Sequence, residues 1–186
     1  MLNCDDPCAL AEVPLNDTCI NQAGLKALFW ALVSDIDLDA TKANVNADFE
    51  LSAWVMNGGA VFNRVYFERE QAFYTATYTE DTDTYETLIQ LMFEGKNAAR
   101  TVALRNALGC CNIVIHTFDN SCVERVFGLE FDGTDLFSGL KPMRIGRHLD
   151  QSGQKGSSKS SDEIDIIGKQ DMAPLFGTVT IAAMPV

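Results

Sequence analysis

Residues 71–93 read QAFYTATYTEDTDTYETLIQLMF, and this stretch decides the fold class. Two runs rich in Tyr, Phe and Thr flank the acidic segment 80–83, and residues of these types are enriched in strands. In the second run the odd positions from Tyr85 to Phe93 carry Tyr, Thr, Ile, Leu and Phe, while most even positions are polar. This alternation predicts a strand that buries its odd-numbered side chains, within a long hairpin assembly.

Strand-like runs continue on both sides of this segment. Leu25 to Val33 is apolar except for Lys26, so a buried strand competes with a short helix there, and the aromatic residues favour the strand. The step Asn57-Gly58-Gly59 predicts a hairpin turn between strands 49–56 and 60–67, because both turn positions need a positive φ. Further strands are predicted over 112–118, 122–131, 143–149, 164–167 and 175–184, with a second hairpin turn at 119–121.

One segment has the composition of a helix. Asn97 to Leu108 is rich in Ala, Leu and Arg, contains no Gly or Pro, and is followed by Gly109 as a stop signal. The polar composition of residues 34–48 predicts a connector between two strands. The chain is therefore predicted to be mainly β, a β-sandwich or partly closed barrel with a long hairpin and one α-helix.

A chain of 186 residues is long enough for one buried core, so a single domain is predicted over residues 23–186. Residues 1–22 contain half of the cysteines and no sustained periodicity, which predicts an irregular N-terminal arm. Residues 151–161 contain no apolar side chain, which predicts a flexible Gly/Ser loop.

The charge of the chain is strongly negative. There are 14 Lys and Arg against 26 Asp and Glu, a formal net charge of −12. This balance argues against a protein that binds free duplex DNA, because neutralising phosphates requires clustered cations. Residues 1–93 carry 15 acidic and 4 basic side chains, whereas residues 94–186 carry 11 and 10, so copies of the chain are expected to present complementary patches or a strongly negative surface.

Segment 141–159 is basic in this acidic chain. We interpret it as a subunit contact that meets an acidic segment such as 80–86 on a neighbouring copy, with a solvated face as the alternative. Its candidate contact residues are Lys141, Arg144, Arg147, Lys155 and Lys159.

The sequence offers little for catalysis. His116 and His148 are the only histidines, neither lies in an H-E-x-x-H motif, and no G-x-S-x-G nucleophile elbow is present. His116 alternates with Val114 and Phe118 in a predicted strand, so we interpret it as a packed or edge histidine without a catalytic role. We therefore predict no catalytic residue, no cofactor and no enzymatic activity.

The cysteines have no spacing typical of a zinc site, so no metal site is predicted and reduced thiols are expected. They are Cys4, Cys8, Cys19, Cys110, Cys111 and Cys122. The sequence also predicts no membrane span, since the apolar stretch 25–33 is far shorter than the roughly 20 residues that a bilayer requires. Acidic residues near the N-terminus argue against a secretory signal.

The order of the predicted elements resembles the tail tube proteins of long-tailed bacteriophages over residues 24–184. The resemblance rests on these features: the Gly-led strand 24–33, the hairpin assembly 60–93, the single helix 97–108, the strand 112–118, the next strand with Gly128, and the Gly/Ser loop before Asp162-Glu163-Ile164-Asp165. It implies a subunit that forms hexameric rings, which stack head to tail into a hollow tube in the virion. In that family the subunits contribute long strands to a continuous barrel around the lumen, which is commonly acidic.

Two features of the residues agree with such an assembly. A negatively lined conduit repels DNA phosphates during transfer, and the first half of the chain supplies excess carboxylates. A chain with this many strands also exposes pairing edges as a monomer, and closure into a ring satisfies them. The candidate lumen residues are Glu68, Glu70, Glu86 and Glu94.

Two other functions stay open at this point. The first is that of another virion component, such as a tail terminator, a head-tail connector or a capsid decoration protein. A β-sandwich hydrolase or carbohydrate-binding module is the competing class. It would need paired carboxylates such as Glu68 and Glu70, or Asp162, Glu163 and Asp165, or surface aromatics such as Trp54, Tyr66, Tyr74 and Tyr78.

Overall fold

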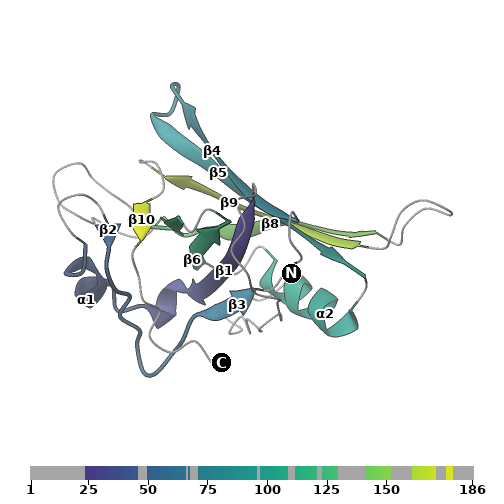
Figure 1. The fold of residues 1–186 in the computed structure, drawn as a ribbon, viewed down its shortest axis with the longest axis horizontal. Helices are drawn as coiled ribbons and strands as arrows, with labels where there is room; N and C mark the ends of the chain where they lie inside the picture. Colours follow the sequence, from purple (N-terminus) through teal and green to yellow (C-terminus); the bar gives the residue numbers. More distant parts are fainter. Residues whose placement is uncertain are drawn as a thin grey trace.

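The computed structural model describes residues 24–45, 50–65, 67, 71–95, 97–108, 112–120, 123–129, 141–151, 161–170 and 175–177. Two β-sheets pack against each other, and the mainly β prediction is confirmed (Figure 1). Both sheets are open, so the arrangement is a sandwich and not a closed barrel.

The first sheet has six strands in the order β2-β10-β7-β6-β1-β3. Their bounds are β1 Leu25–Leu32, β2 Glu50–Leu51, β3 Asn63–Val65, β6 Ile113–Asp119, β7 Glu124–Phe127 and β10 Leu175–Gly177. All its pairings are antiparallel except that of β10 with β2. The predicted hairpin across 119–121 is confirmed, since β6 pairs with β7.

The second sheet has four strands in the order β4-β5-β9-β8, all antiparallel. Their bounds are β4 Ala72–Thr79, β5 Thr84–Glu94, β8 Arg144–Gln151 and β9 Ser161–Gln170. The β4–β5 hairpin extends beyond the rest of the molecule at the top of Figure 1. The prediction for the odd positions of this strand is confirmed from residue 87 on: Thr87, Ile89, Leu91 and Phe93 are buried on the inner face of this sheet, while Tyr85 is half-buried.

The main core lies between the two sheets. Leu28 and Ile115 from the first sheet meet Ile89, Leu91 and Ile166 from the second, and all five are fully buried. The apolar area removed from water in this layer is the main force that holds the sheets together.

Strand β1 is covered on both faces. Leu28 and Trp30 point into the main core, whereas Phe29 and Ala31 belong to a second cluster with Phe62. A strand buried on both faces reads as a continuous apolar run, which is why residues 25–33 fit a strand and a short helix equally well by periodicity. The strand prediction is confirmed.

Two helices are described, and sequence reasoning predicted one of them. Helix α2, Ala98–Ala107, agrees with the prediction, and the Asn97 side chain caps it by accepting from the backbone N–H of Ala99 and Arg100 at 3.0 and 3.2 Å. Helix α1, Leu38–Lys42, was predicted as part of a polar connector. It is only five residues long and too short for a periodic signal, and the Asp37 side chain caps it.

The hairpin predicted at residues 49–67 is wrong. The turn itself forms, with positive φ at Gly58 and Gly59 and a hydrogen bond from the Ala60 N–H to the Asn57 carbonyl. The flanking strands, however, do not pair with each other: β2 pairs with β10, and β3 pairs with β1. These longer-range partners bury Leu51 and Val65 in two different clusters, which a local hairpin would not do.

Several predictions lie outside the described residues. They are the arm 1–22, all six cysteines, residues 152–160 of the predicted loop, and residues 178–184 of the last predicted strand. Within the described part of the chain, no helix is long and apolar enough to cross a membrane.

Candidate functional site

The outer face of the four-stranded sheet is turned away from the core. Its side chains, polar and apolar, form rows across the strands. Register sets Thr77, Glu86 and Lys169 in one row. The next row holds Thr75, Leu88, Ile167 and Arg144, and the third holds Phe73, Gln90, Asp165 and Arg147. Side chains in one row are close neighbours, so this face is one continuous surface built from four strands.

Most charges on the outer face are paired within the chain. Lys169 Nζ lies 2.9 Å from Glu86 Oε1. Arg147 Nε lies 2.6 Å from Asp165 Oδ2, and Arg147 Nη2 lies 3.5 Å from Glu163 Oε2. The hydrogen bond to Asp165 raises the pKa of the Arg147 guanidinium above its ordinary value. The pairs lie on the surface, where each contributes little to stability.

A cavity of about 740 Å³ hollows the outer face toward its hairpin end. Leu88 and Ile167 contribute apolar surface, and the hydroxyls of Thr75 and Thr77 lie along β4. Arg144, the first residue of β8, stands at the opposite side of the cavity. The cavity is also lined by Asn112 and Pro142, from the segments that precede β6 and β8, so it extends past the outer face at the edge of the sheet.

The tip of the β4–β5 hairpin is acidic and exposed. Glu80, Asp81 and Asp83 are all exposed, and no base lies among residues 80–83. The Tyr78 hydroxyl donates to Asp83 Oδ1 at 2.7 Å, which raises the pKa of Tyr78, and the Tyr78 ring packs on Tyr85 with centroids 5.4 Å apart. These contacts connect the end of β4 to the turn and to β5.

In the part of the chain that the structure describes, both outer strands of this sheet have an open edge. Among the described residues, β4 pairs only with β5 and β8 pairs only with β9, and each is eight residues long. The Met92 N–H donates to the Gln71 carbonyl at 2.7 Å, so this pair is of the hydrogen-bonded kind. Hydrogen-bonded and non-hydrogen-bonded pairs alternate along an antiparallel ladder, so the N–H groups of Tyr74, Ala76 and Tyr78 point away from β5.

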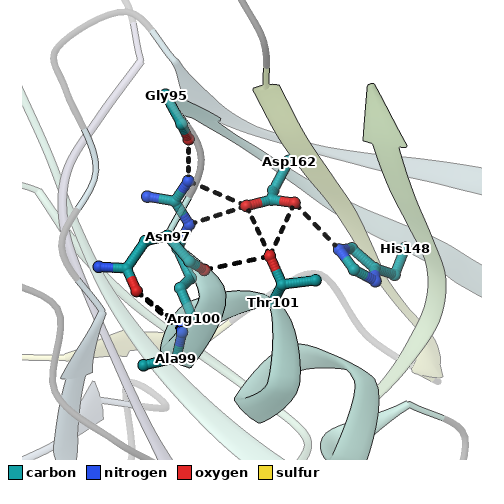
Figure 2. A network of polar contacts seen from close by, with 7 residues as sticks. All are labelled: Gly95, Asn97, Ala99, Arg100, Thr101, His148 and Asp162. Carbon is teal, nitrogen blue, oxygen red and sulfur yellow. Dashed lines mark hydrogen bonds and ion pairs between the residues drawn. The ribbon is translucent and has the colours of Figure 1, made fainter. Parts of the chain in front are cut away.

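The inner face of the same sheet holds a buried ion pair at the other end of its strands (Figure 2). Asp162 on β9 is 0% exposed, and Arg100 on α2 donates to its Oδ2 from Nη2 at 2.9 Å and from Nε at 3.0 Å. Thr101 Oγ1 lies 3.4 Å from both carboxylate oxygens, and His148 Nε2 lies 3.5 Å from Oδ1. These contacts fasten α2 to the sheet.

Arg100 is fixed from other directions as well. Its guanidinium donates to the Gly95 carbonyl and lies over the Phe93 ring, 5.1 Å from the centroid. Because Asp162 is fully buried under these groups, its carboxylate is shielded from solvent and from any solute on the outer face. Glu163 and Asp165 point to the opposite side of β9, so Asp162 does not join them in one carboxylate pair.

His116 on β6 is the second buried polar centre, and its prediction as a packed side chain agrees with its 0% exposure. The Trp54 Nε1–H donates to its Nδ1 at 3.1 Å, and its Nε2 lies 3.1 Å from Glu124 Oε2. Burial lowers the pKa of His116 to about 4, so the ring is neutral at pH 7. Since Nδ1 accepts from Trp54, Nε2 carries the proton and donates to Glu124.

The imidazole of His116 is covered on several sides. Phe118 stacks on it with centroids 5.0 Å apart, and Gly177 lies so close that an added Cβ would stand 3.2 Å from Cε1. A side chain at this position of β10 would press on the imidazole and on Val126.

The sequence-predicted lumen and contact residues are dispersed. Glu86 and Glu94 lie on β5, with Glu86 paired to Lys169 and Glu94 opposite Ser161 in the ladder. Lys141 is half-buried, and Arg144 and Arg147 are exposed on β8. Four candidates lie outside the described residues: Glu68, Glu70, Lys155 and Lys159.

The aromatic residues considered for sugar binding do not gather on one surface. Trp54 packs on Phe62 and donates a hydrogen bond to His116. Tyr74 packs on Phe127, and Tyr78 lies near the tip of the β4–β5 hairpin. Tyr66 lies outside the described residues. Within the described ranges, no group of three or more His, Cys, Asp or Glu side chains is placed to hold a metal ion.

Sequence reasoning missed the Arg100–Asp162 pair and the Trp54–His116–Glu124 chain. The partners in them are eight to 62 residues apart along the sequence, and no local motif connects them. Comparison of the chain with protein-family models, with curated proteins and with solved structures found no match.

Proposed function

We propose that this chain is a virion structural protein, the subunit of a phage tail tube. It assembles with copies of itself into hexameric rings that stack into a conduit for DNA passage into the host, and it acts by association and not by catalysis. Its other partners are further tail proteins, with no membrane involved. The observation that carries the proposal is that β4 and β8, on opposite sides of one four-stranded sheet, each have an outer edge with no strand partner among the described residues.

The directions of the strands favour closure into a ring. Strand β4 runs toward the hairpin tip, and β8 runs away from that end, because β5, β9 and β8 alternate in direction. When copies are arranged around an axis with the same orientation, β4 of one copy meets β8 of the next in antiparallel register. Such a head-to-tail contact is heterologous, which generates a closed ring when the rotation closes.

The outer face suits the wall of a channel. Its Glu86 and Lys169, like its Arg147 and Asp165, are neutralised as pairs. Because Lys169 and Arg147 are held by carboxylates, these two cations offer little to DNA phosphates. Of the candidate lumen residues, Glu86 and Glu94 are described, both on β5, and Glu86 is paired with Lys169.

The first test is electron microscopy of negatively stained purified protein, with light scattering over a concentration series. We expect tubes or stacked six-fold rings. Single rings that never stack favour the alternative, a tail terminator, head-tail connector or capsid decoration protein. A monomer at every concentration contradicts ring formation.

Replacing Ala76 with Pro is expected to abolish ring formation while the monomer stays folded. The Ala76 N–H points to the open edge, so proline removes a donor needed by a neighbouring strand and leaves the β4–β5 ladder intact. Light scattering should show a shift from rings to monomers with an unchanged circular dichroism spectrum. The matched control is Ala76→Ser, which keeps the N–H and should assemble normally; equal assembly of both variants would rule out this edge.

A further inference from the structure

We infer that Arg144 of one subunit binds the acidic hairpin tip, residues Glu80 and Asp81, of the next subunit in the ring. This inference rests on the proposed function and deepens it, because it names the contact that sets how neighbouring edges pair. The partner is a second copy of this chain, and the recognition is that of a guanidinium for carboxylates.

Arg144 differs from the other cations on the outer face. Arg147 and Lys169 are each held by carboxylates of the same sheet. Arg144 is exposed, and within the described part of the chain its guanidinium has no hydrogen bond or ion pair. It stands at the first position of an open edge strand, beside the cavity, where a neighbour can reach it.

The hairpin tip has the complementary property. Glu80 and Asp81 are exposed and have no partner among the described residues, whereas Asp83 is held by Tyr78. Backbone hydrogen bonds from Thr82 N to Thr79 O and from Asp83 N to Glu80 O close the turn. The tip therefore presents two carboxylates, without a partner among the described residues, on a turn that backbone hydrogen bonds close.

Within one chain the two groups stay apart. Arg144 lies in the row of Leu88, four residues from Thr84 at the base of the turn. Four residues correspond to about 13 Å along the strands, and Arg144 lies two strands away from β5, another 10 Å or so across the sheet.

Between copies the same topology brings them together. β4 ends and β8 begins at the hairpin end of the sheet. When β4 pairs with the next copy's β8 in the register that places Arg144 opposite Thr79, the last residue of β4, the tip lies beside the neighbour's Arg144. This register is staggered by four residues from the row that Arg144 shares with Thr75 inside one chain. A slip of one residue in such a pairing would turn every side chain to the wrong face, so a charged contact at one end is an effective way to fix the register.

The test uses charge reversal on each side of the contact. Arg144→Glu, and separately the pair Glu80→Lys with Asp81→Lys, should each raise the dissociation constant of self-association by roughly tenfold or more, measured by sedimentation velocity at low ionic strength. Mixing the two variants one to one should restore assembly, because each interface then joins opposite charges. Arg105→Glu is the matched control, since Arg105 is an exposed arginine on α2, and it should assemble as the wild type does.

The outcomes separate this inference from the proposed function. If the wild type and the Arg144→Glu variant assemble equally well, the charged contact is overturned, but the proposal of ring formation is not. Loss of assembly without recovery in the mixture would also overturn it, since damage to folding is not repaired by a second charge reversal. A wild type that remains monomeric at all concentrations would overturn both.

Discussion

Replacing Asp162 with Ala should lower the free energy of unfolding by about 3–5 kcal/mol, the usual cost of removing one partner of a buried ion pair. Asp162 is fully buried, and the side chain of Arg100 is only 15% exposed. The substitution leaves a guanidinium without its counter-charge under the sheet and cuts the contact between α2 and β9. Urea unfolding followed by circular dichroism measures the effect.

Two further variants test the cause of that loss. Asp165→Ala removes a carboxylate from the same strand, but its partner Arg147 is half-exposed, so a loss below about 1 kcal/mol is expected. The double variant Asp162→Leu with Arg100→Met removes both charges and should recover most of the stability. Equal losses for Asp162→Ala and Asp165→Ala would contradict the role of burial.

The stability of the fold should fall by about 3 kcal/mol between pH 6.5 and pH 4 because of His116 alone. Burial lowers the pKa of this imidazole from 6.5 to about 4. As pH falls below 6.5 the unfolded chain binds a proton that the folded chain excludes until about pH 4. The stabilisation is therefore complete above pH 6.5 and is lost as pH falls through this window.

The local contacts explain why the folded state excludes the proton. Nδ1 already accepts from the Trp54 indole N–H, so protonating it would set two donors against each other in a buried site. NMR titration of the imidazole should give a midpoint near pH 4 for His116.

The linkage can be isolated with a variant that does not titrate. His116→Gln offers an acceptor to Trp54 and a donor to Glu124, and its stability should depend less on pH, by up to about 1.4 kcal/mol per pH unit over this range. The carboxylates contribute to the pH dependence of both proteins, so the difference between them is the quantity to compare. Identical curves would show that His116 binds its proton equally in both states.

The pH prediction and the assembly proposal are independent. His116 lies on β6 of the six-stranded sheet, while the open edges and the hairpin tip belong to the four-stranded sheet. His116→Gln is therefore expected to form rings as the wild type does at pH 7, which gives the assembly experiments a further control.

The sequence by itself determined the elements whose signals are local. The alternation from Tyr85 to Phe93, the acidic turn, and the Ala- and Leu-rich run that begins after Asn97 each act over a few residues, so the β4–β5 hairpin and α2 form as predicted. The two-sheet class follows from them, because apolar faces of this kind must be buried against one another.

The tertiary structure alone decided which strands pair and which polar groups meet. The turn at Gly58 forms as its local preference requires, yet β2 and β3 pair with distant strands because burial of Leu51 and Val65 outweighs one local hairpin. Arg100 contacts Asp162 and Trp54 contacts His116, and the partners in each pair are 62 residues apart in the sequence. A hydrophobic pattern of period two or 3.6 does not predict contacts between such distant residues. Burial in the low-dielectric core makes those pairs decisive for stability, and only the folded arrangement of the sheets creates that environment.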